Sequence, residues 1–84
     1  MQGTYVNLEA AIDALARAER AAAEADDAYR TEHNPHMLPV RRTLYHRRAA
    51  FAAGMAHAIT MLLDGETAAI IEQAAKQRAR EPQP

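Results

Sequence analysis

The chain has 84 residues with 10 Lys+Arg and 11 Asp+Glu, a net charge of −1, which gives no overall attraction to nucleic acid or anionic membranes. One domain spanning residues 1–84 is expected, and domains this small often gain stability by associating with a partner. The sequence contains no cysteine and no serine, which excludes disulfides, zinc-thiolate sites and the two commonest side-chain nucleophiles.

The first helix is expected over residues 8–31. Asn7 can cap its N-terminus, and the negative charge of Glu9 in the first turn interacts favourably with the helix dipole. With Leu8 as heptad position a, positions a, d and g are all apolar and form a continuous stripe. The stripe comprises Leu8, Ala11, Ala14, Leu15, Ala18, Ala21, Ala22, Ala25, Ala28 and Tyr29.

Charged residues occupy the opposite face of this first helix. The pairs Asp13–Arg17 and Asp26–Arg30 have the i,i+4 spacing that stabilises an isolated helix by about 0.2–0.5 kcal/mol per pair. We expect this face to be solvated.

Two prolines, Pro35 and Pro39, interrupt the helical pattern over residues 33–39. A second helix is expected over residues 39–63 because Pro39 suits a first helical turn and Asp64-Gly65 can end the helix. The two helices have nearly equal lengths, which predicts an antiparallel hairpin. A shorter third helix, beginning at Asp64 or Thr67, is expected over residues 66–79, followed by a frayed tail at 81–84. The predicted fold is therefore all-α, a long helical hairpin plus a third helix, in a dimeric helical bundle.

The second half of the second helix, residues 49–63, is apolar on nearly every side. The first helix is expected to cover one side and the third helix another, which leaves apolar surface for a partner. The sequence therefore predicts a protein or dimer interface on this segment, formed by Phe51, Gly54, Met55, Ala58, Ile59, Met61 and Leu62.

Gly54 is unusual because a glycine inside a helix costs about 1 kcal/mol relative to alanine. Ala50, Gly54 and Ala58 lie on one ridge of the helix and would permit close approach of another backbone. One interpretation is that this ridge faces the alanine stripe of the first helix. The other is that the glycine reflects only the small-residue bias of the chain.

The first half of the second helix carries a cluster of arginines. One face, with Arg41, Tyr45 and Arg48, could contact phosphates while the tyrosine stacks on a base. An alternative function is therefore nucleic-acid binding through Arg41, Arg42, Tyr45, Arg47 and Arg48.

Ion pairing within the hairpin offers a different explanation of these arginines. An antiparallel arrangement places them beside the acidic end of the first helix, so interhelix pairs are expected to neutralise several of them. The acidic residues of that end are Glu24, Asp26, Asp27 and Glu32.

No catalytic or metal-binding motif is found. The glycines are isolated, and neither a His-Glu-x-x-His nor a helical Glu-x-x-His pattern occurs. His33 and His36 are expected to be solvated loop residues, and His57 to be an interior or interface histidine. We therefore expect no enzyme activity, no metal and no cofactor.

The favoured function is protein–protein association in a regulatory, inhibitory or assembly role, with a homodimer or another protein as partner and no membrane. A cytoplasmic location is expected because residues 1–5 lack the layout of a signal peptide. Alanine at 21 of 84 positions, and nine arginines to one lysine, indicate a GC-rich genome such as that of an actinobacterium or its phages.

Overall fold

The computed structural model describes residues 7–82, which form three helices and no strand. These are α1 (Leu8–Thr31), α2 (Leu38–Leu62) and α3 (Gly65–Arg80). The all-helical class is confirmed, and each helix begins and ends within one residue of the predicted bounds. The N-terminal residues 1–5 and the last two residues of the expected tail lie outside the described part of the chain.

Local capping interactions explain where α1 and α3 begin. The side chain of Asn7 accepts a hydrogen bond from the backbone N–H of Ala10 at 3.1 Å, as expected for a helix N-cap. Asp64 caps α3 in the same way, accepting from the backbone N–H of Thr67 at 2.8 Å and from the Thr67 hydroxyl at 3.0 Å. These hydrogen bonds lower the pKa of the Asp64 carboxyl. Of the two starts considered for the third helix, Asp64 is the one observed.

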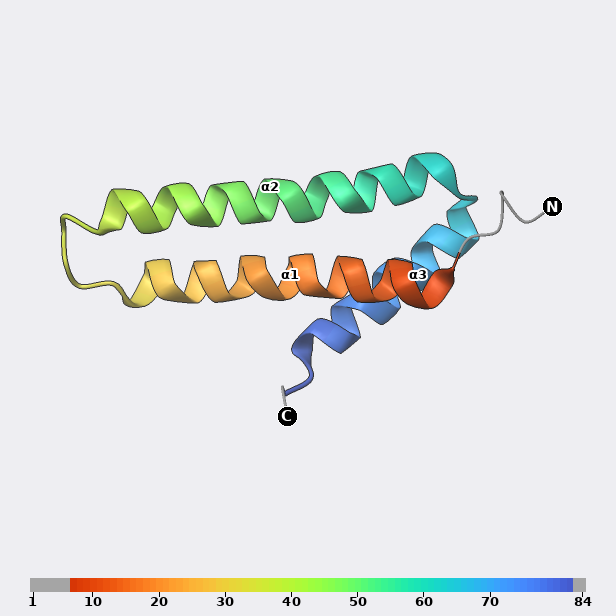
Figure 1. The fold of residues 1–84 in the computed structure, drawn as a ribbon, viewed down its shortest axis with the longest axis horizontal. Coiled ribbons are helices and arrows are strands. Elements are labelled where there is room, and N and C mark those ends of the chain that lie inside the picture. The colour runs from red at the N-terminus through yellow and green to blue at the C-terminus, as the bar shows by residue number, and fades with distance from the viewer. Residues whose placement is uncertain (1–6, 83–84) are drawn as a thin grey trace.

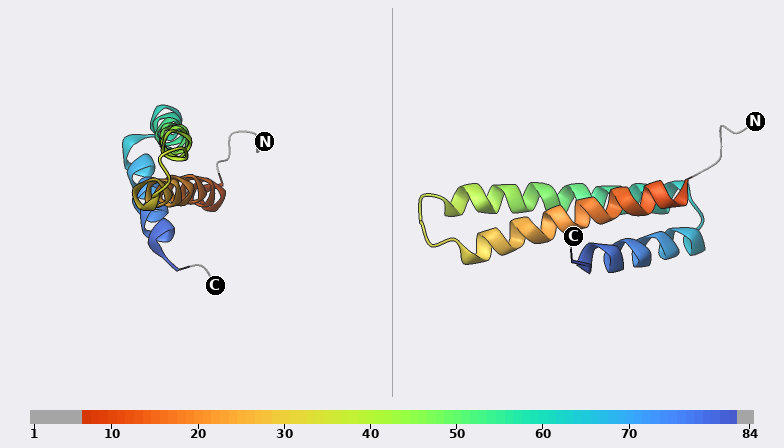
Figure 2. Two further views of the ribbon diagram at one scale, coloured as in Figure 1. Left: turned by 90° about the vertical axis from the view of Figure 1, so that its left-hand side faces the viewer. Right: turned by 60° about the horizontal axis from the view of Figure 1, so that its bottom comes forward.

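α1 and α2 lie side by side and run in opposite directions (Figure 1). α3 leaves the end of α2 and crosses α1 (Figure 2). The molecule is elongated, with extents of 54 × 27 × 20 Å. The third helix covers the second helix only in part. α3 packs mainly on α1, and it reaches the C-terminal part of α2, where the Thr60 hydroxyl donates to Glu72 at 3.2 Å.

The hydrophobic core lies at this three-helix end. Ile12, Leu15 and Ile71 are buried there together with Ala16 and Ala75. Ile12 and Ala16 lie outside the stripe predicted for the first helix, because α3 covers a second face of α1. Of the two adjacent isoleucines of α3, Ile71 is 0% exposed and belongs to this core, whereas Ile70 is 57% exposed.

Toward the loop the core consists of small residues. Ala18, Ala25 and Ala52 are buried between α1 and α2, and the rings of Tyr29 and Tyr45 stack with their centroids 6.3 Å apart. Of the nine buried residues in the described chain, six are alanine. The apolar area that stabilises the isolated chain is therefore small.

Ion pairs and a hydrogen bond connect α3 to α1. Arg78 contacts Asp13 at 2.6 Å and Glu9 at 3.3 Å, while Arg20 donates to the carbonyl oxygen of Arg78 at 2.7 Å. The predicted Asp13–Arg17 pair is wrong, because Asp13 binds Arg78 instead.

The other predicted pair on α1 is present. Asp26 and Arg30 are 2.7 Å apart, and this hydrogen bond raises the pKa of the arginine. The pair is exposed, so it contributes little to the stability of the fold.

Candidate protein-binding site

α2 has two different faces at helical spacing. The inner face packs on α1 and its residues recur every three or four positions, as expected for one side of a helix. All of them are buried or half-buried: Arg41, Tyr45, Ala49, Ala52, Ala56 and Ile59. The C-cap residue Leu63 is half-buried as well.

A second stripe, which we call the outer flank, runs the length of α2 beside the inner face. It comprises Val40, Leu44, Arg47, Phe51, Gly54, Ala58, Met61 and Leu62, with spacings of four and three residues until the final pair. Every member except the half-buried Leu44 is exposed. The large side chains are exposed by 62% at Phe51, 71% at Met61 and 81% at Leu62, so within the described chain this surface has no cover.

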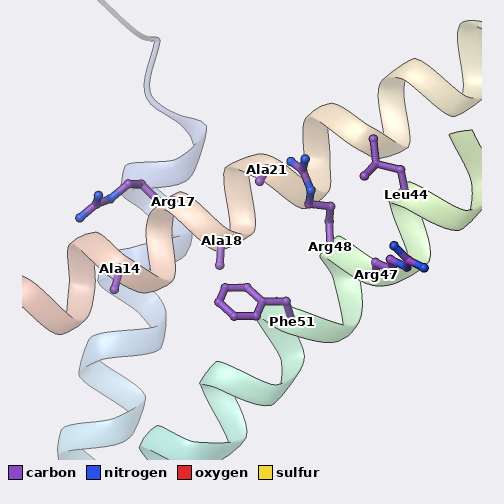
Figure 3. A pocket seen from close by; sticks show the side chains of 8 residues that line it. All are labelled: Ala14, Arg17, Ala18, Ala21, Leu44, Arg47, Arg48 and Phe51. Carbon is purple, nitrogen blue, oxygen red and sulfur yellow. The ribbon is translucent and has the colours of Figure 1, made fainter.

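A groove separates the outer flank from α1 (Figure 3). Ala14, Ala18 and Ala21 line its α1 side, and Leu44 and Phe51 line its α2 side. The small side chains of α1 keep the groove open, and Phe51 lies across from them with its ring toward Ala18 (Figure 3). Its polar lining residues are all arginines, namely Arg17, Arg47 and Arg48.

The structure divides the predicted interface residues between the two faces. Met55 and Ile59 are half-buried and pack against the three-helix core, which places them on the side of α2 away from the outer flank. They point inward because they follow Ala52 by three and seven residues. The other predicted interface residues lie together on the outer flank: Phe51, Gly54, Ala58, Met61 and Leu62.

Val40 and Leu44 were missed by the sequence analysis, as was the α1 side of the groove. Val40 and Leu44 belong to the same stripe as Phe51, which follows them by eleven and seven residues. The spacing of three and four residues continues from the basic first half of the helix into the apolar second half and could have identified them. The sequence analysis treated the two halves separately, so this continuity was not seen.

The ridge of Ala50, Gly54 and Ala58 does not face α1, contrary to one interpretation of the sequence. All three residues are exposed, and a Cβ added at Gly54 would meet nothing within 4 Å. The packing of α1 against α2 therefore does not require this glycine.

Ion pairing within the hairpin accounts for one arginine of the basic cluster. The Nε of Arg41 donates to Glu32 at 2.8 Å. This bond, together with one from the backbone N–H of Asn34, lowers the pKa of the Glu32 carboxyl. Arg47 and Arg48 are exposed, as is Arg42, and form no salt bridge with any described residue. The expectation that several of these arginines are neutralised by α1 is wrong.

The predicted nucleic-acid face does not form as expected. Tyr45 is half-buried and stacks on Tyr29, and Arg41 is held by Glu32. The remaining arginines lie at different angles around the helix because they occupy positions 42, 47 and 48. These residues therefore do not form one cationic face with an available aromatic ring.

The histidines do not assemble into a site. All four are exposed, including His57, which was expected in the interior or an interface. Residues 7–82 hold no group of three His, Asp or Glu side chains placed to bind a metal ion. Over the same residues, no helix combines the length and the apolar character needed to cross a membrane.

Comparisons with known proteins match the chain to no family model, no curated protein and no solved structure. The candidate site is therefore defined by its geometry and chemistry.

Proposed function

We propose that the protein is non-catalytic and acts by binding a partner through the outer flank of α2, in a regulatory, inhibitory or assembly role. The observation that carries this proposal is the uncovered apolar stripe beside the groove. Phe51, Met61 and Leu62 each expose more than half of their surface there. A contiguous apolar stripe of this kind is typical of interaction surfaces and not of solvated helix faces.

The period of the stripe indicates what covers it. An apolar stripe with alternating spacings of three and four residues packs against another helix. The inner face of α2 already packs in this way on α1, and the outer flank repeats the pattern. A helix lying in the groove would contact both α1 and α2, as in recognition of a helix by a groove.

Because the core is small, binding of a partner is expected to stabilise the folded chain. The isolated chain buries few large side chains, and any partner that binds the folded state stabilises it further. A second copy would complete a dimeric helical bundle, and a different protein would complete a complex of similar architecture.

Affinity capture from an extract of the source organism tests the proposal, with Phe51→Glu as the probe variant and Ala53→Glu as its control. Both positions are exposed on α2, but Ala53 lies on the side away from the groove. We expect wild type and Ala53→Glu either to capture the same protein or to self-associate equally in sedimentation experiments. Phe51→Glu is expected to lose both the captured protein and the self-association. Equal behaviour of the two variants, with both folded by circular dichroism, would contradict the proposal.

Nucleic-acid binding is the second candidate, favoured because Arg42, Arg47 and Arg48 form no salt bridge with any residue of the described part of the chain. A mobility-shift assay at moderate salt with Arg47→Ala and Arg48→Ala tests it. Binding by wild type and its loss in the double variant would support this candidate, and no shift with wild type would eliminate it.

A further inference from the structure

The charges of the two long helices are opposite. α2 contains four arginines and no carboxylate, whereas α1 contains six carboxylates and three arginines. The inner face of α2 is thus already covered by an acidic helix rich in alanine. Among the described residues, Arg41 is the one arginine of α2 that forms a salt bridge, and its partner Glu32 lies just beyond the end of α1.

Among the described residues, no carboxylate lines the groove beside the outer flank. Arg17, Arg47 and Arg48 line it, all three are exposed, and none of them forms a salt bridge with a described residue. Arg48 reaches toward α1 near Ala21, whereas Arg17 and Arg47 point away from the Phe51 ring (Figure 3). A purely apolar helix in the groove would remove water from the guanidinium group of Arg48 without replacing it, which is unfavourable.

A second copy of the chain fits this groove poorly. When the two-fold axis of a dimer passes through the groove, each groove meets an identical groove. The lining arginines of one copy would then approach those of the other, and Arg48 from each copy would lie close to the shared interior. Like charges brought together in this way oppose association.

A nucleic acid also fits poorly, because the walls of the groove are apolar. Ala14, Ala18 and Ala21 face Leu44 and Phe51 across it, and none of these side chains can donate to a phosphate. The tyrosine nearest to the arginines, Tyr45, is stacked on Tyr29.

We infer that the occupant of this groove is an acidic amphipathic helix supplied by a different protein, an inference that rests on the proposed function. Its apolar stripe contacts the alanines of α1 and the ring of Phe51. Carboxylates at the edges of that stripe form ion pairs with Arg47 and Arg48. The exposed Gly54 and Ala58 allow its backbone to approach α2 closely.

Two synthetic peptides of about three heptads each test this inference by fluorescence anisotropy with the full chain. Both carry alanine and leucine at positions a and d, and they differ at the flanking positions, which are all Glu in one peptide and all Lys in the other. We expect the Glu peptide to bind and the Lys peptide not to bind. The affinity for the Glu peptide is expected to fall as salt is added, because ion pairs near a surface are screened.

Variants locate the binding. Phe51→Glu, and the double variant Arg47→Glu with Arg48→Glu, are each expected to lower the affinity for the Glu peptide by about tenfold or more. The double variant is expected to bind the Lys peptide instead. Arg42→Glu is the matched control, because Arg42 is exposed on α2 outside the groove, and it should change the affinity by less than about twofold.

Several results would overturn the inference. These are equal binding of the two peptides, no binding of the Glu peptide, or a loss with Arg42→Glu as large as with the double variant. Self-association that Phe51→Glu abolishes would assign the groove to a second copy, and the proposed function would survive. Binding of a DNA oligonucleotide by wild type and Phe51→Glu alike, with no protein captured, would refute both proposals.

Discussion

Replacing Ile71 by alanine is expected to destabilise the chain strongly, whereas the same replacement at Ile70 is expected to have little effect. The two residues are neighbours on α3 and have identical side chains. Ile71 is 0% exposed and packs with Ile12 and Leu15 in the core, whereas Ile70 is 57% exposed. The comparison therefore isolates burial from helix propensity and from residue type.

The magnitudes follow from the burial. Removing a buried isoleucine side chain costs about 2–5 kcal/mol, through lost transfer free energy and the cavity left behind. A chain of 84 residues is expected to have a free energy of unfolding of about 4–13 kcal/mol, and its alanine-rich core favours the lower part of that range. At Ile70 the change is expected to stay within about 0.5 kcal/mol, partly because alanine is the better helix former.

Urea denaturation followed by circular dichroism measures both differences. In thermal unfolding, Ile71→Ala is expected to lower Tm by at least roughly 8 °C, since each kcal/mol corresponds to roughly 4–8 °C in a domain of this size. Equal destabilisation by the two variants, or a larger effect at Ile70, would refute the assignment of the α3 face that packs on α1.

Three further predictions concern other parts of the fold. Gly54→Ala is expected to raise the free energy of unfolding by about 0.5–1 kcal/mol, because a Cβ there meets nothing within 4 Å; a lower urea midpoint would contradict this. Arg78→Gln is expected to lower the urea midpoint at low salt and to have less effect at high salt, since Arg78 pairs with carboxylates of α1; a salt-independent effect would argue against these pairs. Glu32 and Asp64 have folded pKa values below their ordinary values of 4.5 and 3.8, so their stabilising contribution is complete above those values and is lost as the pH falls through the folded values. Urea midpoints measured down to about pH 3 are therefore expected to decline less in Glu32→Gln with Asp64→Asn than in wild type, and an identical decline would refute this assignment.

The helices could be predicted from the sequence because their signals are local. Asn7 and Asp64 are capping residues whose hydrogen bonds reach only three residues ahead, and Pro39 fits the first turn of a helix. Such signals depend little on tertiary packing, so the bounds agreed to within one residue.

The packing of α3 could not be predicted in the same way. Its placement depends on Ile12 and Ala16, which fall outside the heptad stripe, and on Arg78, which reaches Asp13 across 65 positions. A contact that distant leaves no pattern in a single sequence. The local i,i+4 rule therefore assigned Asp13 to Arg17.

The candidate site was predicted in part for a related reason. Composition showed that residues 49–63 were too apolar for a hairpin to cover, and Phe51, Met61 and Leu62 are indeed exposed. Composition could not show which side of α2 faces α1, so Met55 and Ile59, which pack against the core, were grouped with the exposed residues of the outer flank. The groove itself needs both helices in place, because its alanine wall belongs to α1.

Site-specific photo-crosslinking tests the central claim most directly. A benzophenone amino acid is placed at Phe51 on the outer flank or at Ala53 on the opposite side of α2, and the full chain is irradiated in an extract of the source organism. We expect a discrete protein adduct from position 51 and none from position 53. Adducts of equal yield from both positions, or from position 53 alone, would show that the outer flank of α2 is not the binding surface.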